Sequence, residues 1–125
     1  SRADISALAQ AKAANYCGQA IVLREYGLPV DSFEKLYLAG GFANYVNESN
    51  AIGIGFIANM PIEKVQKVGN VSLEGAVIML LSTAKRSEIE KLTATVQHVE
   101  LETAPDFFDF FVEGCMFKPM ESVIS

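Results

Sequence analysis

The order of the predicted elements indicates an α/β fold with a small mixed sheet of about three strands and crossover helices. Two short, largely apolar runs stop at glycine, residues 35–39 and 65–68, and each predicts a buried strand. Residues 96–101 alternate between apolar and polar side chains, which predicts a third strand. Half of the 125 residues are apolar, enough for a core, and the length fits a single domain over residues 1–125.

A long helix is predicted at the start of the chain. Ser1 and Asp4 have the spacing of a capping box, in which a hydroxyl and an acid satisfy the first backbone N–H groups. Apolar residues then recur at helical spacing until Gly27, a residue type that commonly ends helices. Pro29 prevents continuation of the helix.

Shorter helices are predicted between and after the strands. Asn47 is a suitable cap for a brief helix, and Ser72 for a longer one over about 73–82. Residues 86–95 have the composition of a more polar helix. The sheet strands would therefore be separated by helices, as in crossover connections.

The last predicted helix begins with Thr103 and Asp106 as a capping box and Pro105 at its first position, and it runs to about Glu113. It is rich in acids and phenylalanines. Phe107, Phe110 and Phe111 share one face, which predicts a core contact, whereas Asp106, Asp109 and Glu113 flank the other.

Charge and composition exclude several classes of function. Ten Lys and Arg against fifteen Asp and Glu give a net charge of −5, which argues against nucleic acid and anionic membranes as partners. No apolar run approaches the ~20 residues of a membrane span, and no signal segment is recognisable. Two cysteines are too few for a disulfide scaffold, so we expect a cytoplasmic protein.

The glycines that follow the first two predicted strands are candidate ligand-binding positions. Gly40 and Gly41 follow the first strand, and Gly69 and Asn70 follow the second. A backbone without Cβ atoms can come close to a ligand at the carboxyl edge of a sheet, and its N–H groups can face a phosphate. Tight turns without any ligand also use these residue types, so the spacing alone leaves both interpretations open.

Residues 53–58 match the G-x-G-x-x-A dinucleotide pattern but lack its structural context. That motif requires a buried strand directly before it and a helix after it. Here polar, helix-like residues precede the glycines and Pro61 follows them. We therefore expect no dinucleotide site there, unless residues 49–52 form a strand.

Residues 35–45, Lys-Leu-Tyr-Leu-Ala-Gly-Gly-Phe-Ala-Asn-Tyr, resemble the adenosine motif of the actin, sugar kinase and Hsp70 superfamily. More closely, they resemble the C-terminal domain of reductive activators of corrinoid proteins. Further agreement with that family comes from residues 11–14, 68–70, 73–76 and 105–113. The resemblance covers nearly the whole chain and implies part of an actin/Hsp70/ribonuclease H-like subdomain, the C-terminal fragment of a larger ATP-binding domain.

The family resemblance also implies a function. Such activators use ATP to return cob(II)amide to cob(I)amide in a corrinoid methyltransferase system, with electrons entering through a 2Fe–2S cluster in an N-terminal domain. Gly40, Gly41 and Phe42 would line the adenosine and phosphate side of the cleft, with Gly69 and Asn70 in the next turn. ATP or ADP, with Mg in the full-length protein, would bind there. The partners would be the corrinoid protein and the remainder of the parent protein, and this chain alone would not be catalytic.

An alternative function from the residues themselves is protein interaction. The acidic, Phe-rich helix near the C-terminus could dock a corrinoid or electron-carrier protein. A small sheet also has unpaired edges, and exposed edges recruit partners, so we expect the isolated chain to form a homodimer.

Overall fold

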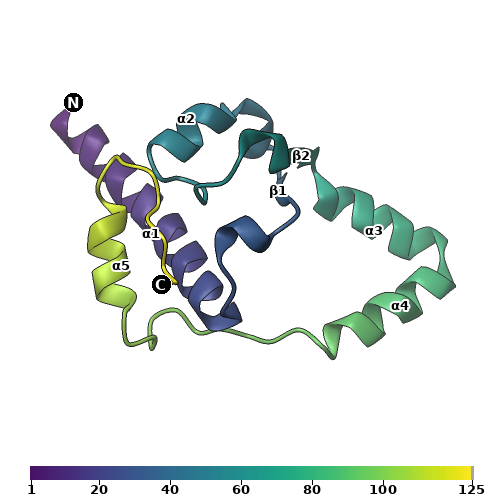
Figure 1. Ribbon diagram of the computed structural model, residues 1–125. Coiled ribbons are helices and arrows are strands. Elements are labelled where there is room, and N and C mark those ends of the chain that lie inside the picture. Colours follow the sequence, from purple (N-terminus) through teal and green to yellow (C-terminus); the bar gives the residue numbers. More distant parts are fainter. Residues whose placement is uncertain (125) are drawn as a thin grey trace. The chain divides into compact units, whose positions relative to one another are not determined.

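The computed structural model describes residues 1–124 and places five α-helices and two strands along the chain (Figure 1). The elements are α1 (Arg2–Tyr26), β1 (Leu36–Ala39), α2 (Glu48–Gly53), β2 (Val65–Gly69), α3 (Val71–Leu81), α4 (Thr83–Thr93) and α5 (Phe107–Gly114). Short 3-10 turns occur at η1 (Val30–Ser32), η2 (Phe42–Tyr45) and η3 (Ile62–Lys64). The α/β class is confirmed, and the sheet has two parallel strands, β1 and β2.

Two compact units make up the chain. The first contains residues 1–36, 47–65 and the chain from Glu100 onward, and the second contains residues 37–46 and 66–99. The first unit therefore holds α1, α2 and α5, whereas the second holds most of the paired strands, α3 and α4.

The first unit is organised by α1, whose ends follow the predicted signals. Ser1 Oγ accepts a hydrogen bond from the Asp4 N–H at 3.3 Å, and the Asp4 carboxylate accepts from the amino terminus at 2.6 Å. Gly27 ends the helix in the left-handed conformation, with φ at 76°. Both cap predictions are confirmed.

A buried stripe of α1 packs against α5, which lies alongside it (Figure 1). Tyr16 and Ala20 of α1 form the core cluster with Ala58 and Met120. At Gly114 the two helices approach so closely that a Cβ atom would lie 2.9 Å from Ala13 Cα. Glycine at this position therefore sets the distance between α1 and α5.

Lys12 is the unusual member of this core, because its side chain is only 1% exposed. Its ammonium group lies 5.4 Å from the ring centre of Tyr16 and 5.8 Å from that of Phe117. Among residues 1–124 the structure gives neither Lys12 Nζ nor the Tyr16 hydroxyl a hydrogen-bond partner. Burial lowers the pKa of Lys12, and burial together with Glu113 raises the pKa of Tyr16 to about 12.

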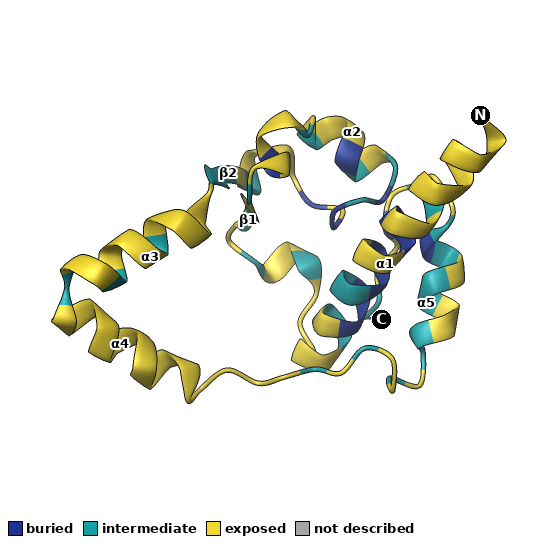
Figure 2. Cartoon of the chain, turned by 180° about the vertical axis from the view of Figure 1, so that it is seen from behind, coloured by how far each residue is buried: buried dark blue, intermediate teal, exposed yellow. Residues whose placement is uncertain are grey.

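The second unit buries far less of its surface. The helices α3 and α4 contact each other, yet both are exposed along most of their length (Figure 2). The apolar side chains of α3 are largely accessible, namely those of Leu73, Val77, Ile78, Leu80 and Leu81. A large exposed apolar surface of this kind is typical of interaction sites.

Several predicted boundaries are wrong. Residues 96–101 form no strand, because the alternating pattern finds no neighbouring strand to pair with. The helix predicted from residue 73 begins at Val71, because Asn70 and not Ser72 provides the cap. Ser82 caps the next helix, which begins at Thr83 and not at residue 86.

The last helix also differs from the prediction. It begins at Phe107, and Asp106 makes no side-chain capping bond. Asp106 instead forms an ion pair with Arg24 of α1, so it is not part of a solvated acidic face. The Phe prediction holds, since Phe107, Phe110 and Phe111 are partly buried whereas Phe108 is 72% exposed.

Substituting Gly114→Ala should lower the free energy of unfolding by about 1–3 kcal/mol, because the new methyl group would overlap the α1 backbone. Denaturant unfolding followed by circular dichroism measures the change. Gly53→Ala is the matched control, since a Cβ there meets no atom within 4 Å. Equal stability of the two variants would contradict the close approach.

Substituting Lys12→Met should raise the free energy of unfolding at pH 7 by about 1–4 kcal/mol, because it removes a buried amine without a hydrogen-bond partner. The folded-state pKa of Lys12 is below its ordinary 10.5, so the wild type gains stability as the pH rises through the folded value toward 10.5. The advantage of Lys12→Met should therefore shrink between pH 7 and pH 10.

Denaturant unfolding of the wild type and of Lys12→Met at each pH measures how far their difference in free energy of unfolding narrows. Lys91→Met serves as the control because Lys91 is exposed on α4. A difference between wild type and Lys12→Met that stays constant with pH would contradict the lowered pKa.

Candidate functional site

The two glycine turns predicted to bind a ligand lie next to each other in the second unit. Gly40 follows β1 and Gly69 ends β2, and the Gly40 N–H donates a hydrogen bond to the Gly69 carbonyl at 2.7 Å. Both residues have positive φ angles, 99° at Gly40 and 69° at Gly69. L-residues with side chains rarely adopt such angles, so glycine is what allows both turns to form.

Gly41 differs from Gly40 and Gly69, because its position does not require a glycine. Its φ of −61° and ψ of −37° are accessible to any residue. A Cβ atom at Gly40, Gly41 or Gly69 would meet no heavy atom within 4 Å. Neither backbone conformation nor internal packing requires a glycine at position 41, and the space beside the turn is open.

An aromatic group lies directly beyond the first turn. Phe42 begins η2 and is 73% exposed, and Tyr45 at the end of the same turn is 88% exposed. Ala43 between them is buried and anchors the turn. Exposed aromatic faces beside a glycine turn can stack on a planar ligand such as a nucleotide base.

Asn70 has a structural role that the sequence did not indicate. Its side-chain carbonyl oxygen accepts a hydrogen bond from the Leu73 N–H at 3.2 Å and caps α3. The N-terminus of α3, with its partial positive charge, therefore follows directly after the Gly69 turn. The side-chain oxygen of Asn70 is therefore used to stabilise the start of α3. Only the NH₂ group of this side chain could donate a hydrogen bond to a ligand.

Lys67 is a residue of this region that the sequence analysis missed. It lies in β2, and its ammonium group donates to the Asn44 carbonyl in η2 at 3.4 Å. The side chain thus reaches from the second strand to the loop that follows the first glycine turn. Its position two residues before Gly69 was the available signal, but one lysine inside a strand is too common to stand out.

The G-x-G-x-x-A pattern does not have the geometry of a dinucleotide site. The residues before it form α2 and not a strand, in agreement with the sequence analysis. A Cβ atom at Gly55 would lie 2.3 Å from the Lys118 carbonyl oxygen. Packing within the first unit, and not a ligand, thus requires glycine at this position.

The first unit contains an apolar pocket of about 190 Å³, lined mainly by α1, the segment before β1, and Ala58 and Met60. Gln19 is a polar residue in its wall, but its amide already donates to the Phe56 carbonyl at 2.9 Å and accepts from the Ala58 N–H at 2.8 Å. Lys35 also borders the pocket, but the remaining lining residues are apolar.

Residues 1–124 contain no cluster of three or more His, Cys, Asp or Glu side chains that could hold a metal ion. The same residues include no helix with the length and apolarity required to cross a membrane.

A parallel strand pair whose carboxyl ends carry glycine turns is typical of nucleotide-binding α/β proteins. Comparison with protein families identifies the family of this α/β chain. Residues 1–124 match the family described as the C-terminal domain of RACo, the ASKHA domain. The chain belongs to this family, and the resemblance found in the sequence is confirmed.

A curated relative supports the same assignment. The chain is 32% identical over 114 residues to the corrinoid activation enzyme RamQ of Eubacterium limosum. The match covers 91% of this chain but only 19% of RamQ, so the chain spans about a fifth of the length of this relative.

Proposed function

We propose that the two glycine turns form one wall of an adenine-nucleotide site in an ATP-dependent activator of corrinoid proteins. The observation that carries the proposal is the hydrogen bond of 2.7 Å between Gly40 and Gly69, with open space beside both turns. The turns lie at the carboxyl ends of paired parallel strands, where α/β proteins commonly bind nucleotides.

Each proposed site residue has a separate task. Gly40 ties the first turn to the second through its N–H, Gly41 gives the phosphates access to the backbone, and Phe42 offers an aromatic face to the base. Gly69 holds the second turn against the first, and Asn70 fixes the start of α3 beside it. These residues bind and orient the ligand, and the chemistry of hydrolysis would need groups from the rest of the parent protein.

The proposal extends to the activity of the parent protein. In the parent protein, ATP binding or hydrolysis, with Mg, would drive electron transfer that returns cob(II)amide to cob(I)amide on a corrinoid protein. The name of RamQ, a corrinoid activation enzyme, supports this assignment. The electrons would come from a 2Fe–2S cluster outside these residues. Dimer formation through the strand edges stays a prediction.

Substituting Gly41→Val should weaken ATP and ADP binding at least about tenfold, because the branched side chain would fill the space where the phosphates approach the backbone. The backbone at Gly41 accepts any residue, so the melting temperature should change little. Isothermal titration calorimetry of the complete protein measures affinity. Gly53→Val is the control, and normal nucleotide binding by Gly41→Val would show the cleft assignment to be wrong.

A second candidate function is docking of a partner through α5. Phe108 is 72% exposed and Val112 is 45% exposed, and Asp109 is exposed beside them. Aromatic residues are enriched in protein interfaces, and a polar rim commonly surrounds them. Asp106 is excluded from this surface because it pairs with Arg24.

If α5 docks the corrinoid protein, the double substitution Phe108→Ser and Asp109→Lys should reduce its capture in a pull-down by about tenfold or more. The fold should be retained, since both side chains are exposed. Circular dichroism checks this. Glu88→Lys together with Leu92→Ser on α4 is the matched control, and an unchanged pull-down would discard the docking role of α5.

A further inference from the structure

The apolar pocket of the first unit has no part in the functions proposed above. Its volume of about 190 Å³ is lined almost entirely by apolar atoms of α1, of the segment before β1, and of Ala58 and Met60. An engineered apolar cavity of ~150 Å³ in another protein stays free of water and binds benzene. The pocket is therefore large enough for an apolar molecule of roughly seven to ten non-hydrogen atoms.

The polar residue in the wall of the pocket, Gln19, has its hydrogen-bonding groups already in use. Its amide donates to the backbone carbonyls of Asn15 and Phe56 at 3.3 and 2.9 Å, and its side-chain oxygen accepts from the Ala58 N–H at 2.8 Å. Lys35 borders the pocket but is exposed. A charged group enclosed between these walls would lose its hydration without equivalent hydrogen bonds. The lining therefore favours an uncharged, apolar ligand.

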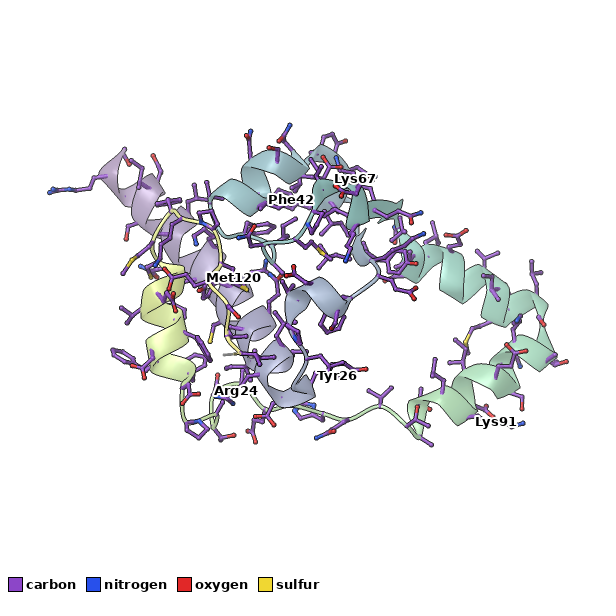
Figure 3. All side chains as sticks on the ribbon, in the orientation of Figure 1. Arg24, Tyr26, Phe42, Lys67, Lys91 and Met120 are labelled. Carbon is purple, nitrogen blue, oxygen red and sulfur yellow. The ribbon has the colours of Figure 1, made fainter. Side chains whose placement is uncertain are left out.

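Hydrogen bonds and a ring contact hold the walls of the pocket in place. The bonds made by the glutamine amide fix residues 56–58 against α1. Lys64 donates to the backbone carbonyls of Asp31 and Phe33, both at 2.9 Å. The ring of Phe33 also contacts that of Tyr26, the last residue of α1, with 5.6 Å between the ring centres (Figure 3). Because the walls are held in this way, a ligand can bind with little rearrangement of the chain.

The pocket is accessible from solvent and can adapt to its ligand. Val22 lines it from α1 and is 51% exposed, so the pocket opens to solvent beside this residue. Met60, by contrast, is only 5% exposed. The unbranched side chain of methionine can take several conformations, which lets a wall adjust to the shape of an apolar guest.

We infer that this pocket is a binding site for a small, uncharged apolar molecule, of the size of one aromatic ring with a short aliphatic substituent. The inference is independent of the proposed nucleotide site, because none of the glycine-turn residues lines the pocket. A ligand of this kind binds the folded chain alone and therefore stabilises the first unit.

Toluene is a suitable probe, and the test uses the complete protein with labelled methyl groups, followed by nuclear magnetic resonance. Toluene should bind with a Kd of about a millimolar or lower. The methyl signals of Leu23, Val30 and Leu36, which line the pocket, should shift as toluene is added, whereas those of Val112 on α5 should not. Benzoate, which has a similar size and a negative charge, should bind at least about tenfold more weakly.

Substituting Val22→Trp should weaken toluene binding at least about tenfold, because the larger ring would occupy the pocket. Ile5→Trp is the matched control. It introduces the same ring on the same helix, at a residue that is 61% exposed and does not line the pocket, and it should leave the affinity unchanged. Circular dichroism checks that both variants are folded.

Three results would overturn the inference. Lining methyl signals that do not shift with toluene would exclude the site, as happens if another part of the complete protein fills the pocket. Shifts of equal size at Val112 would show non-specific uptake, and an unchanged affinity in folded Val22→Trp would place the ligand elsewhere. Benzoate binding as tight as that of toluene would contradict the uncharged class of ligand. If Val22→Trp does not fold, the methyl shifts of the wild type still decide.

Discussion

The hydrogen bond from the Gly40 N–H to the Gly69 carbonyl is the constraint on which the candidate site depends. It ties together two turns that are distant in the sequence, and it forms only because both glycines adopt positive φ angles. The bond holds the two turns in register. One edge of the sheet therefore carries the open backbone at Gly41, the ring of Phe42 and the start of α3. The bond thus extends the pairing of β1 and β2 into the two turns.

The two units of the chain differ in how much apolar surface they bury. The first has a core in which Tyr16, Ala20, Ala58 and Met120 pack between α1 and its neighbours, at a helix separation set by Gly114. The second presents its aromatic and apolar side chains to solvent, including Phe42 and most of α3. Such accessibility suits a surface that receives a ligand or another protein surface.

Burial of Lys12 shows that the core is not purely apolar. The amine lies over the rings of Tyr16 and Phe117, and the loss of hydration lowers its pKa. Attraction to aromatic faces compensates in part for this loss, as in other cation–π contacts. The nearby Tyr16 hydroxyl is also buried, so its pKa is raised and the phenol stays neutral over the physiological range.

The sequence by itself determined the features that depend on neighbouring residues: the capping box at Ser1, the left-handed end at Gly27, the cap at Asn47 and the two strands that stop at glycine. The family could also be recognised from the sequence alone, because residues 35–45 form one continuous motif and the other matching segments occur in the order found in the family. Tertiary structure alone decided what depends on distant partners. Residues 96–101 have a strand pattern but no strand beside them, Asp106 is taken by Arg24, and Lys67 reaches Asn44 across the strand pair. Local patterns specify backbone conformation, whereas pairing, burial and the assembly of a site require chain segments that only folding brings together.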